Sequence, residues 1–122
     1  MKKVRNLINI TDLTVEEIDQ LIEVADDIVA NHAEYENICA HKKLATLFFE
    51  PSTRTRLSFE AAMLELGGSV LGFSEAKSSS AAKGESVSDT VRTVGCYADI
   101  IAMRHPKEGA PIVAAQRTPV PI

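Results

Sequence analysis

The sequence predicts an α/β domain in which a parallel sheet is flanked by helices, and three observations support this. Short apolar runs alternate with segments of helical periodicity, in the order of one helix followed by three strand–helix pairs. Leu44–Phe49 is a short run of mostly bulky apolar residues, typical of a strand covered on both faces. Pro51 and the pair Gly67-Gly68 mark the ends of neighbouring elements, because neither residue type continues them readily.

Length and composition indicate one domain over residues 1–122. A net charge of −4 disfavours general nucleic-acid binding, and no apolar run approaches the roughly 20 residues of a membrane span. The first ten residues are too polar for a signal peptide. Cys39 and Cys96 have no metal-ligand spacing and are interpreted as reduced thiols. We therefore expect a cytoplasmic protein that binds neither nucleic acid nor membrane and uses no metal.

The first helix is predicted from Leu13 to about Glu36. Thr14 and Glu17 have the spacing of a capping box, in which each side chain binds the backbone N–H of the other residue. Apolar residues recur at helical spacing and predict one apolar face: Val15, Ile18, Leu21, Ile22, Ala25, Ile28 and Val29. The acidic residues of this helix predict a solvated face, since none are paired at the spacing of metal ligands.

The segment after the first strand predicts a turn and a second helix. Ser52 is a predicted N-cap, and the helix runs from Thr53 to Leu66 before Gly67-Gly68 ends it. Its expected core contacts are Leu57, Ala61, Met63, Leu64 and Leu66.

The remaining elements are predicted from the same patterns. They are a strand at 69–73, a polar loop at 74–84, a helix at 85–97, a strand at 99–103, a short helix at 109–116 and the start of a fourth strand at 120–122. In the helix at 85–97 the apolar stripe is Val87, Val91 and Val94, continued by Ala98.

Polar side chains follow all three predicted strands. Ser52–Thr55 follow the first strand, a loop with serines and lysines follows the second, and Arg104-His105 follow the third. Ligands of parallel sheets bind outside the carboxyl ends of the strands. The first turn of a helix also offers unpaired N–H groups and the positive end of its dipole. The sequence therefore predicts a site for phosphate or another compact anion at this edge.

The two arginines of the central turn cannot both face one ligand, because they lie about 200° apart around a helix. Arg54 is the better candidate ligand, and Arg56 is expected to pair with Glu60 or to pack its stem. For Arg104, an anion ligand and a structural salt bridge are equal alternatives. His105 is either a site residue or a cap of the strand end.

Lys83 precedes a predicted helix N-terminus, where a cation is unfavourable unless an anion binds. Ser78, Ser79 and Ser80 are by themselves ordinary loop residues. The sequence has no Gly-rich phosphate loop, dinucleotide fingerprint or nucleophile elbow. Catalysis at this edge would thus proceed by positioning and electrostatic stabilisation, without a covalent intermediate.

The segment Phe48-Phe49-Glu50-Pro51-Ser52-Thr53-Arg54-Thr55-Arg56 resembles the carbamoyl-phosphate signature of the aspartate and ornithine carbamoyltransferases. The segments at 83–86 and 103–106 lie at the family's distances from it, and the resemblance extends along essentially the whole chain. Glu50–Arg56 and Arg104-His105-Pro106 are more similar to the aspartate than to the ornithine members. The resemblance implies carbamoyl transfer to the amine of L-aspartate, the committed step of pyrimidine synthesis, without a cofactor.

The resemblance also implies roles for individual residues. Ser52, Thr53, Arg54 and Thr55 would bind the phosphate of carbamoyl phosphate, with Thr55 also near the carbonyl oxygen. Arg104 would bridge the phosphate and the carbonyl oxygen and stabilise charge as phosphate leaves.

Two further roles implied by the resemblance involve other parts of the family's assembly. Ser79 and Lys83 would enter the site of a neighbouring subunit in a homotrimer, with Ser78 or Ser80 as alternatives for the serine. Glu50 would take part in contacts between the two domains of the enzyme. A regulatory chain is a further partner that the family allows.

The family's catalytic chains are more than twice as long as this sequence. We therefore expect residues 1–122 to be a partial carbamoyl-phosphate-binding domain, with the aspartate-binding domain absent and no activity in isolation. Aspartate would bind only with that missing domain. Two alternatives are a fragment of an ornithine-type carbamoyltransferase and a non-catalytic remnant that assembles through its first helix and its Ser/Lys loop.

Overall fold

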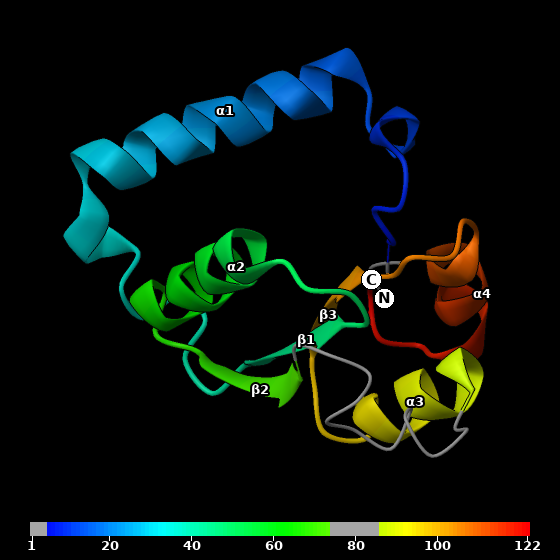
Figure 1. Ribbon diagram of the computed structural model, residues 1–122. Coiled ribbons are helices and arrows are strands. Elements are labelled where there is room, and N and C mark those ends of the chain that lie inside the picture. Colours follow the sequence, from blue (N-terminus) through cyan, green and yellow to red (C-terminus); the bar gives the residue numbers. More distant parts are fainter. Residues whose placement is uncertain (1–4, 74–85) are drawn as a thin grey trace.

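The computed structural model describes residues 5–73 and 86–122. They contain a three-stranded parallel sheet in the order β2-β1-β3 with flanking helices, which confirms the predicted fold class (Figure 1). The strands are β1 (Lys43–Phe48), β2 (Ser69–Phe73) and β3 (Ile100–Arg104). The helices are α1 (Val15–Ala30), α2 (Thr53–Glu65), α3 (Val87–Val94) and α4 (Ala110–Arg117), with single 3-10 turns η1 (Ile10–Asp12) and η2 (His32–Glu34).

β1 is the central strand, and its apolar sequence is explained by burial on both faces. Residues 44–48 are all buried. Alternate side chains point to opposite faces, so Ala45 and Leu47 join the cluster formed with α3 and α4, whereas Leu44 packs with Met63 of α2. The strand predicted at Leu44–Phe49 is therefore confirmed to within one residue.

The face covered by α3 and α4 contains the larger core. Val91 of α3 and Ala114 of α4 are completely buried against Ala45 and Leu47 of β1. Val87 and Val94 pack against the same cluster, so the predicted apolar stripe of this helix is confirmed. The helix itself is shorter than predicted among the described residues, running from Val87 to Val94 rather than from 85 to 97.

The face covered by α2 differs from the prediction. Of the five residues expected to supply core contacts, only Met63 is buried, whereas Leu57 and Leu64 are 53% and 56% exposed. The prediction for this face was wrong because α2 turns another stripe toward the sheet. That stripe consists of Arg56, Glu60 and Met63, whose spacing of four and three residues places them on one side of a helix.

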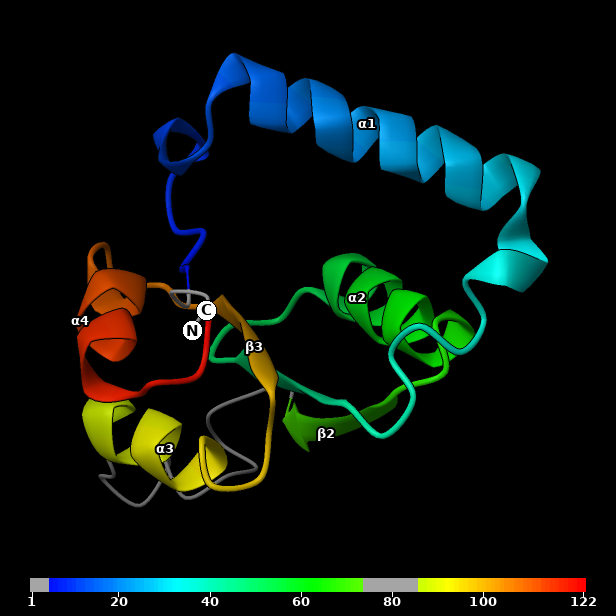
Figure 2. The same ribbon diagram turned by 180° about the vertical axis from the view of Figure 1, so that it is seen from behind.

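The first helix begins as predicted but ends early. Thr14 and Glu17 form the expected capping box, with the Glu17 N–H donating to Thr14 Oγ1 at 3.1 Å. The helix stops at Ala30 because Asn31 leaves the helical region, and the Asn31 side chain donates to Asp27 Oδ1 at 2.7 Å. None of the α1 residues is buried, so its apolar face is not covered by the described part of the chain. In Figures 1 and 2, α1 lies on the α2 side of the sheet.

The end of α2 confirms the predicted glycine stop. Gly67 has φ +87°, and its N–H donates to the Leu64 carbonyl oxygen at 3.0 Å. The Gly68 N–H donates to the Met63 carbonyl oxygen at 2.9 Å, which completes a Schellman motif. A Cβ on Gly67 would lie 2.5 Å from the Glu36 carbonyl oxygen, so this position excludes larger residues.

The predicted start of a fourth strand at 120–122 is not assigned as a strand. Pro121 accepts a hydrogen bond from the Ile101 N–H at 2.9 Å, and the Leu7 N–H donates to the Ile122 carbonyl oxygen at 2.7 Å. The segment therefore lies beside β3. Pro119 and Pro121 have no N–H to donate to a ladder, which explains why regular pairing does not form.

Candidate anion-binding site

The ends of β1 and β3 bring the predicted site residues together. Phe48 at the end of β1 pairs in register with Arg104 at the end of β3. The Phe49 N–H donates to the Arg104 carbonyl oxygen at 2.8 Å, so the contact extends one residue past the strand. The chain then turns through Glu50 and Pro51 into α2 (Figure 1). Residues 48 and 104 are far apart in the sequence, and only the parallel pairing of the strands makes them neighbours.

The N-terminus of α2 presents backbone donors at this edge. The first intrahelical bond runs from the Arg56 N–H to the Ser52 carbonyl oxygen at 3.0 Å. The N–H groups of residues 53–55 precede that bond and make no hydrogen bond to a described residue. These groups and the positive end of the helix dipole form a favourable place for an anion.

Ser52 occupies the predicted N-cap position, but its side chain does not cap the helix. Its Oγ instead accepts a hydrogen bond from Arg104 Nη1 at 3.1 Å. The capping prediction was therefore wrong about the hydroxyl and right about the helix boundary. The hydroxyl lies between the helix N-terminus and the guanidinium, where it could contact an anion held by both.

Arg104 is held in place by Glu50. Its Nε donates to Glu50 Oε1 at 2.8 Å, and the two side chains are 47% and 34% exposed. Of the two alternatives left by the sequence, the structure contains the salt bridge. Because Nε binds Glu50 while Nη1 reaches the Ser52 hydroxyl, the guanidinium lies beside the N-cap residue of α2. An anion bound there would meet Arg104 without a large movement and would compete with Glu50 for it.

His105 supports the strand end. Its ring lies 4.7 Å from that of Phe49, and its Nδ1 accepts the Lys107 N–H at 2.9 Å. Partial burial lowers the pKa of His105, the charge of Lys107 lowers it further, and Glu50 opposes both effects. A lowered pKa keeps the ring neutral near pH 7, as the accepted hydrogen bond requires. Of the two predicted alternatives, the geometry matches a cap of the strand end.

The other predicted residues occupy different positions around the turn. Thr53 and Arg54 are exposed, and Arg54 makes no ion pair with a described residue. Thr55 is half-buried. Arg56 Nη1 lies 3.8 Å from Glu60 Oε1, as predicted. Ser79 and Lys83, with the neighbouring serines at 78 and 80, lie outside the described residues.

Two contacts of this region were missed from the sequence. The pairing of Glu50 with Arg104 joins residues 54 positions apart, and no local pattern indicates it. The hydrogen bond from Thr46 Oγ1 to Glu60 Oε1, at 2.9 Å, had a signal: Thr46 is the polar residue in the otherwise apolar run 44–48. A buried hydroxyl requires a partner, and that requirement could have prompted a search for one.

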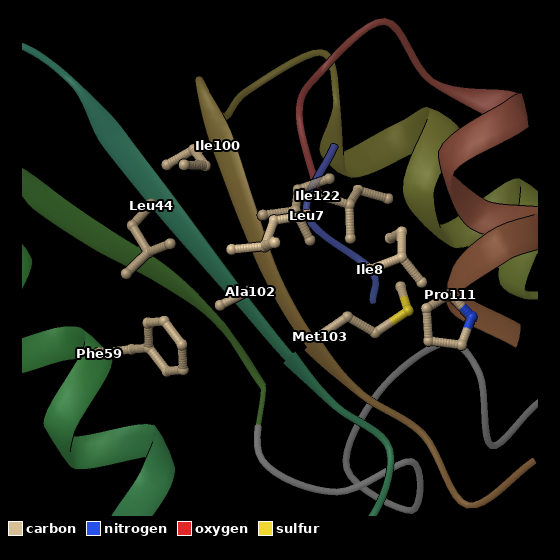
Figure 3. A pocket seen from close by; sticks show the side chains of 10 residues that line it. Leu7, Ile8, Leu44, Phe59, Ile100, Ala102, Met103, Pro111 and Ile122 are labelled. Atoms are coloured by element: carbon tan, nitrogen blue, oxygen red, sulfur yellow. The ribbon is translucent and has the colours of Figure 1, made fainter. Parts of the chain in front are cut away.

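A separate apolar pocket of about 300 Å³ lies along β3 (Figure 3). Its walls come from the chain near the N-terminus, the sheet, α2 and the start of α4, and include Leu7, Leu44, Phe59, Ala102, Met103 and Pro111. Such a lining offers no counter-charge to an anion, so this pocket is not the candidate site. Within the described residues, no group of three or more metal-binding side chains comes together, and no helix is long and apolar enough to span a bilayer.

A family model described as aspartate/ornithine carbamoyltransferase, carbamoyl-P binding domain, matches residues 5–122. The chain belongs to the aspartate/ornithine carbamoyltransferase family. The parallel sheet and its flanking helices therefore form the fold of a domain of this family.

Individual members of the family are similar over the whole chain. The aspartate carbamoyltransferase catalytic subunit of Clostridium botulinum is 60% identical over 122 residues, which are 100% of this chain and 40% of that protein. The catalytic subunit of M. jannaschii aspartate transcarbamoylase superposes with a TM-score of 0.88 at 48% identity, over 96% of this chain and 40% of that one. The aspartate transcarbamoylase of Trypanosoma cruzi in complex with carbamoyl phosphate superposes with a TM-score of 0.90 at 35% identity. The superposition covers 98% of this chain and 39% of that one. The chain thus spans about 40% of the length of these relatives.

Proposed function

We propose that this chain is the carbamoyl-phosphate-binding part of an aspartate carbamoyltransferase catalytic subunit. The observation that carries the proposal is the meeting of the α2 N-terminus, whose first N–H groups bind no described residue, with Arg104 and Ser52 at one edge of the sheet. The similarity to aspartate carbamoyltransferases supports the choice of aspartate as the second substrate rather than ornithine.

In the proposed complex, the phosphate group lies on the N–H groups of residues 53–55. Arg54 and the hydroxyls of Ser52, Thr53 and Thr55 would complete its hydrogen bonds. Arg104 would bridge the phosphate and the carbonyl oxygen of the carbamoyl group. A cation between these two groups stabilises negative charge on both as the reaction proceeds, which is electrostatic catalysis.

The proposed reaction begins when the uncharged amine of L-aspartate attacks the carbamoyl carbon. A tetrahedral intermediate forms with negative charge on the former carbonyl oxygen, close to Arg104 and Thr55. The bond from carbon to the phosphate oxygen then breaks, phosphate leaves with the electron pair, and the amine loses a proton to give N-carbamoyl-L-aspartate. No cofactor is needed for these steps.

The partners of this domain are part of the same proposal. Ser79 and Lys83 would act in the site of a neighbouring subunit of a homotrimer, and Glu50 would contact a second, aspartate-binding domain. Residues 1–122 alone would bind carbamoyl phosphate without turnover. A regulatory chain stays a prediction from the family resemblance, and a cytoplasmic location stays a prediction from the composition.

Calorimetric titration with fresh carbamoyl phosphate tests the site. Arg54→Ala removes a charge-assisted contact worth about 1.5–3 kcal/mol, so affinity should fall about 10- to 100-fold. Arg117→Ala, at the far end of α4, removes the same charge away from the site and should leave the affinity unchanged. Equal binding by the wild-type and Arg54→Ala proteins would reject the assigned site.

A colorimetric assay for carbamoyl-aspartate tests the second part of the proposal. We expect no formation above background from residues 1–122 with carbamoyl phosphate and aspartate. Substantial turnover would mean that the aspartate contacts do not require the additional length of the relatives. Carbamoyl phosphate binding that is absent altogether would favour the non-catalytic alternative.

A further inference from the structure

The helix that carries the anion site contacts the sheet through polar side chains. Arg56, Glu60 and Met63 form the stripe of α2 that turns toward β1, and only the last of them is apolar. The side chains of Arg56 and Glu60 are 32% and 20% exposed. One turn toward the N-terminus the same stripe reaches Ser52, whose carbonyl oxygen accepts the Arg56 N–H. The polar stripe thus leads directly to the site.

The stripe is anchored in the central strand by a hydrogen bond. Thr46, in the middle of β1, is 1% exposed and donates from Oγ1 to Glu60 Oε1 at 2.9 Å. The carbonyl oxygen of Leu71 in β2 lies farther from the same hydroxyl, at 3.5 Å. Because β1 pairs with strands on both sides, Thr46 belongs to the most constrained part of the sheet.

The same carboxylate oxygen connects the strand to Arg56. Glu60 Oε1 lies 3.8 Å from Arg56 Nη1, so it faces both the buried hydroxyl and the guanidinium. Arg56 Nε is buried and finds no acceptor among the described residues. A donor left in this state destabilises the fold. Stability alone therefore does not explain why polar side chains stand between α2 and β1. Apolar side chains of similar volume often stabilise such a contact equally well or better.

Hydrogen bonds have an effect on geometry that apolar contacts lack. An apolar interface allows a helix to slide or rotate slightly, whereas a bond to one buried hydroxyl fixes a distance and a direction. From the other side, Arg104 Nη1 donates to the Ser52 hydroxyl just before the helix. The first turn of α2 is thus held at two points, and both are connected to strands of the sheet.

We propose that Thr46, Glu60 and Arg56 position the anion-binding first turn of α2. Glu60 and Thr46 act as positioning residues, because neither would touch the ligand. The inference rests on the proposed binding of carbamoyl phosphate at this turn. The hydrogen bond from Thr46 in the central strand to Glu60 in α2 sets the position of the N–H groups of residues 53–55 relative to Arg104.

A pair of substitutions at Thr46 tests this inference. Thr46→Val keeps the shape of the side chain and removes the donor, whereas Thr46→Ser keeps the hydroxyl. Thr90→Val is the matched control, because Thr90 is 5% exposed on α3 and its Oγ1 makes no hydrogen bond to a described residue. Glu60→Gln, which keeps the acceptor oxygen and removes the charge, is a second variant for the contact with Arg56.

Affinity for carbamoyl phosphate is the first readout, measured by calorimetry on folded protein with inorganic phosphate in a parallel arm. Thr46→Val should bind about 3- to 10-fold more weakly, in the range of couplings transmitted through packed residues. Thr46→Ser should recover the wild-type affinity within about twofold, and Thr90→Val should match the wild type. Equal affinities for Thr46→Val and wild type would overturn the inference while leaving the proposed function intact.

Backbone amide chemical shifts of residues 53–55, measured without ligand, are the second readout. We expect Thr46→Val and Glu60→Gln to shift these signals and the Arg56 Nε–H signal, and Thr46→Ser and Thr90→Val to leave them in place. Unchanged shifts in Thr46→Val would overturn the inference. If the wild-type protein binds neither anion, the proposed function fails, and the chemical shifts alone decide whether the turn is positioned in this way.

Discussion

The two faces of the sheet are held in different ways. On the α3/α4 face, buried apolar residues from β1, β3, α3 and α4 form one cluster around Leu47 and Val91. On the α2 face, the buried apolar cluster consists of Leu44, Met63 and Ala102, and next to it lie the polar contacts of Thr46 and Glu60. The first face supplies most of the apolar burial, and the second carries the helix that presents the candidate anion site.

This difference teaches that rigidity at a binding site need not come from the largest core. Apolar burial is nondirectional and contributes about 25 cal/mol per Å², whichever way the side chains interlock. Polar contacts contribute less net free energy and specify a direction. On the α2 face, polar contacts that orient the helix therefore stand where apolar contacts could have been buried. The outer residues of α2, such as Leu57 and Leu64, are exposed.

The largest expected effect is the difference in stability between two leucine variants, one in the α3/α4 core and one on the outer face of α2. Leu47→Ala removes a side chain that is 1% exposed and should lower the free energy of unfolding by about 2–5 kcal/mol. Leu64→Ala, at 56% exposure on α2, should change it by less than about 0.5 kcal/mol. Urea denaturation of both variants measures the two values. Similar losses would mean that the outer face of α2 is buried in the folded protein.

The next effect concerns α1, which buries no residue and depends on local contacts. Thr14→Ala removes the capping hydrogen bond to the Glu17 N–H and should destabilise the helix by about 1 kcal/mol. The control is Thr11→Ala, three residues earlier, whose exposed side chain makes no hydrogen bond to a described residue. Circular dichroism at 222 nm during thermal unfolding compares them. Indistinguishable curves would contradict the dependence of α1 on its cap.

A smaller effect, on phosphate affinity, is expected from the ion pair between Glu50 and Arg104. Glu50→Gln weakens the ion pair and removes a negative charge from the edge of the anion site. Because an exposed pair is worth at most about 1 kcal/mol, affinity for inorganic phosphate should rise by up to about fivefold. Glu65→Gln, at the other end of α2, is the charge-matched control. Weaker phosphate binding by Glu50→Gln would show that Glu50 aligns Arg104 rather than competing for it.

The smallest effect is a pH dependence of α1. The Arg5 guanidinium and the Thr14 N–H bind the Glu17 carboxylate, and they lower its pKa to about 2. A lowered pKa means that this contribution is complete above the ordinary value of 4.5 and is lost as the pH falls toward 2. In Glu17→Gln the thermal midpoint of α1 should vary less over that interval than in the wild type. Parallel pH profiles of the two proteins would show that Glu17 does not cause the pH dependence of α1 stability.

Much of the fold was predictable because its signals are local. The apolar run at 44–49, the capping box of Thr14 and Glu17 and the glycines after α2 each depend on residues within one turn or strand. The polar groups of the candidate anion site were predictable for the same reason, since a strand, a turn and a helix N-terminus follow each other directly in the chain. The pairing of Arg56 with Glu60 also lies within one helical turn.

The sequence by itself determined most of the strands and helices and which of their ends carry the polar groups of the candidate site, because periodicity, caps and turn residues act over a few positions. Only the tertiary structure decided which helix face meets the sheet, that Arg104 pairs with Glu50, and that Ser52 accepts from Arg104 instead of capping α2. Those contacts depend on the strand order β2-β1-β3, which brings residues about 50 positions apart to one edge. A local pattern shows that a polar or apolar face exists, and the packing of distant elements decides what that face contacts.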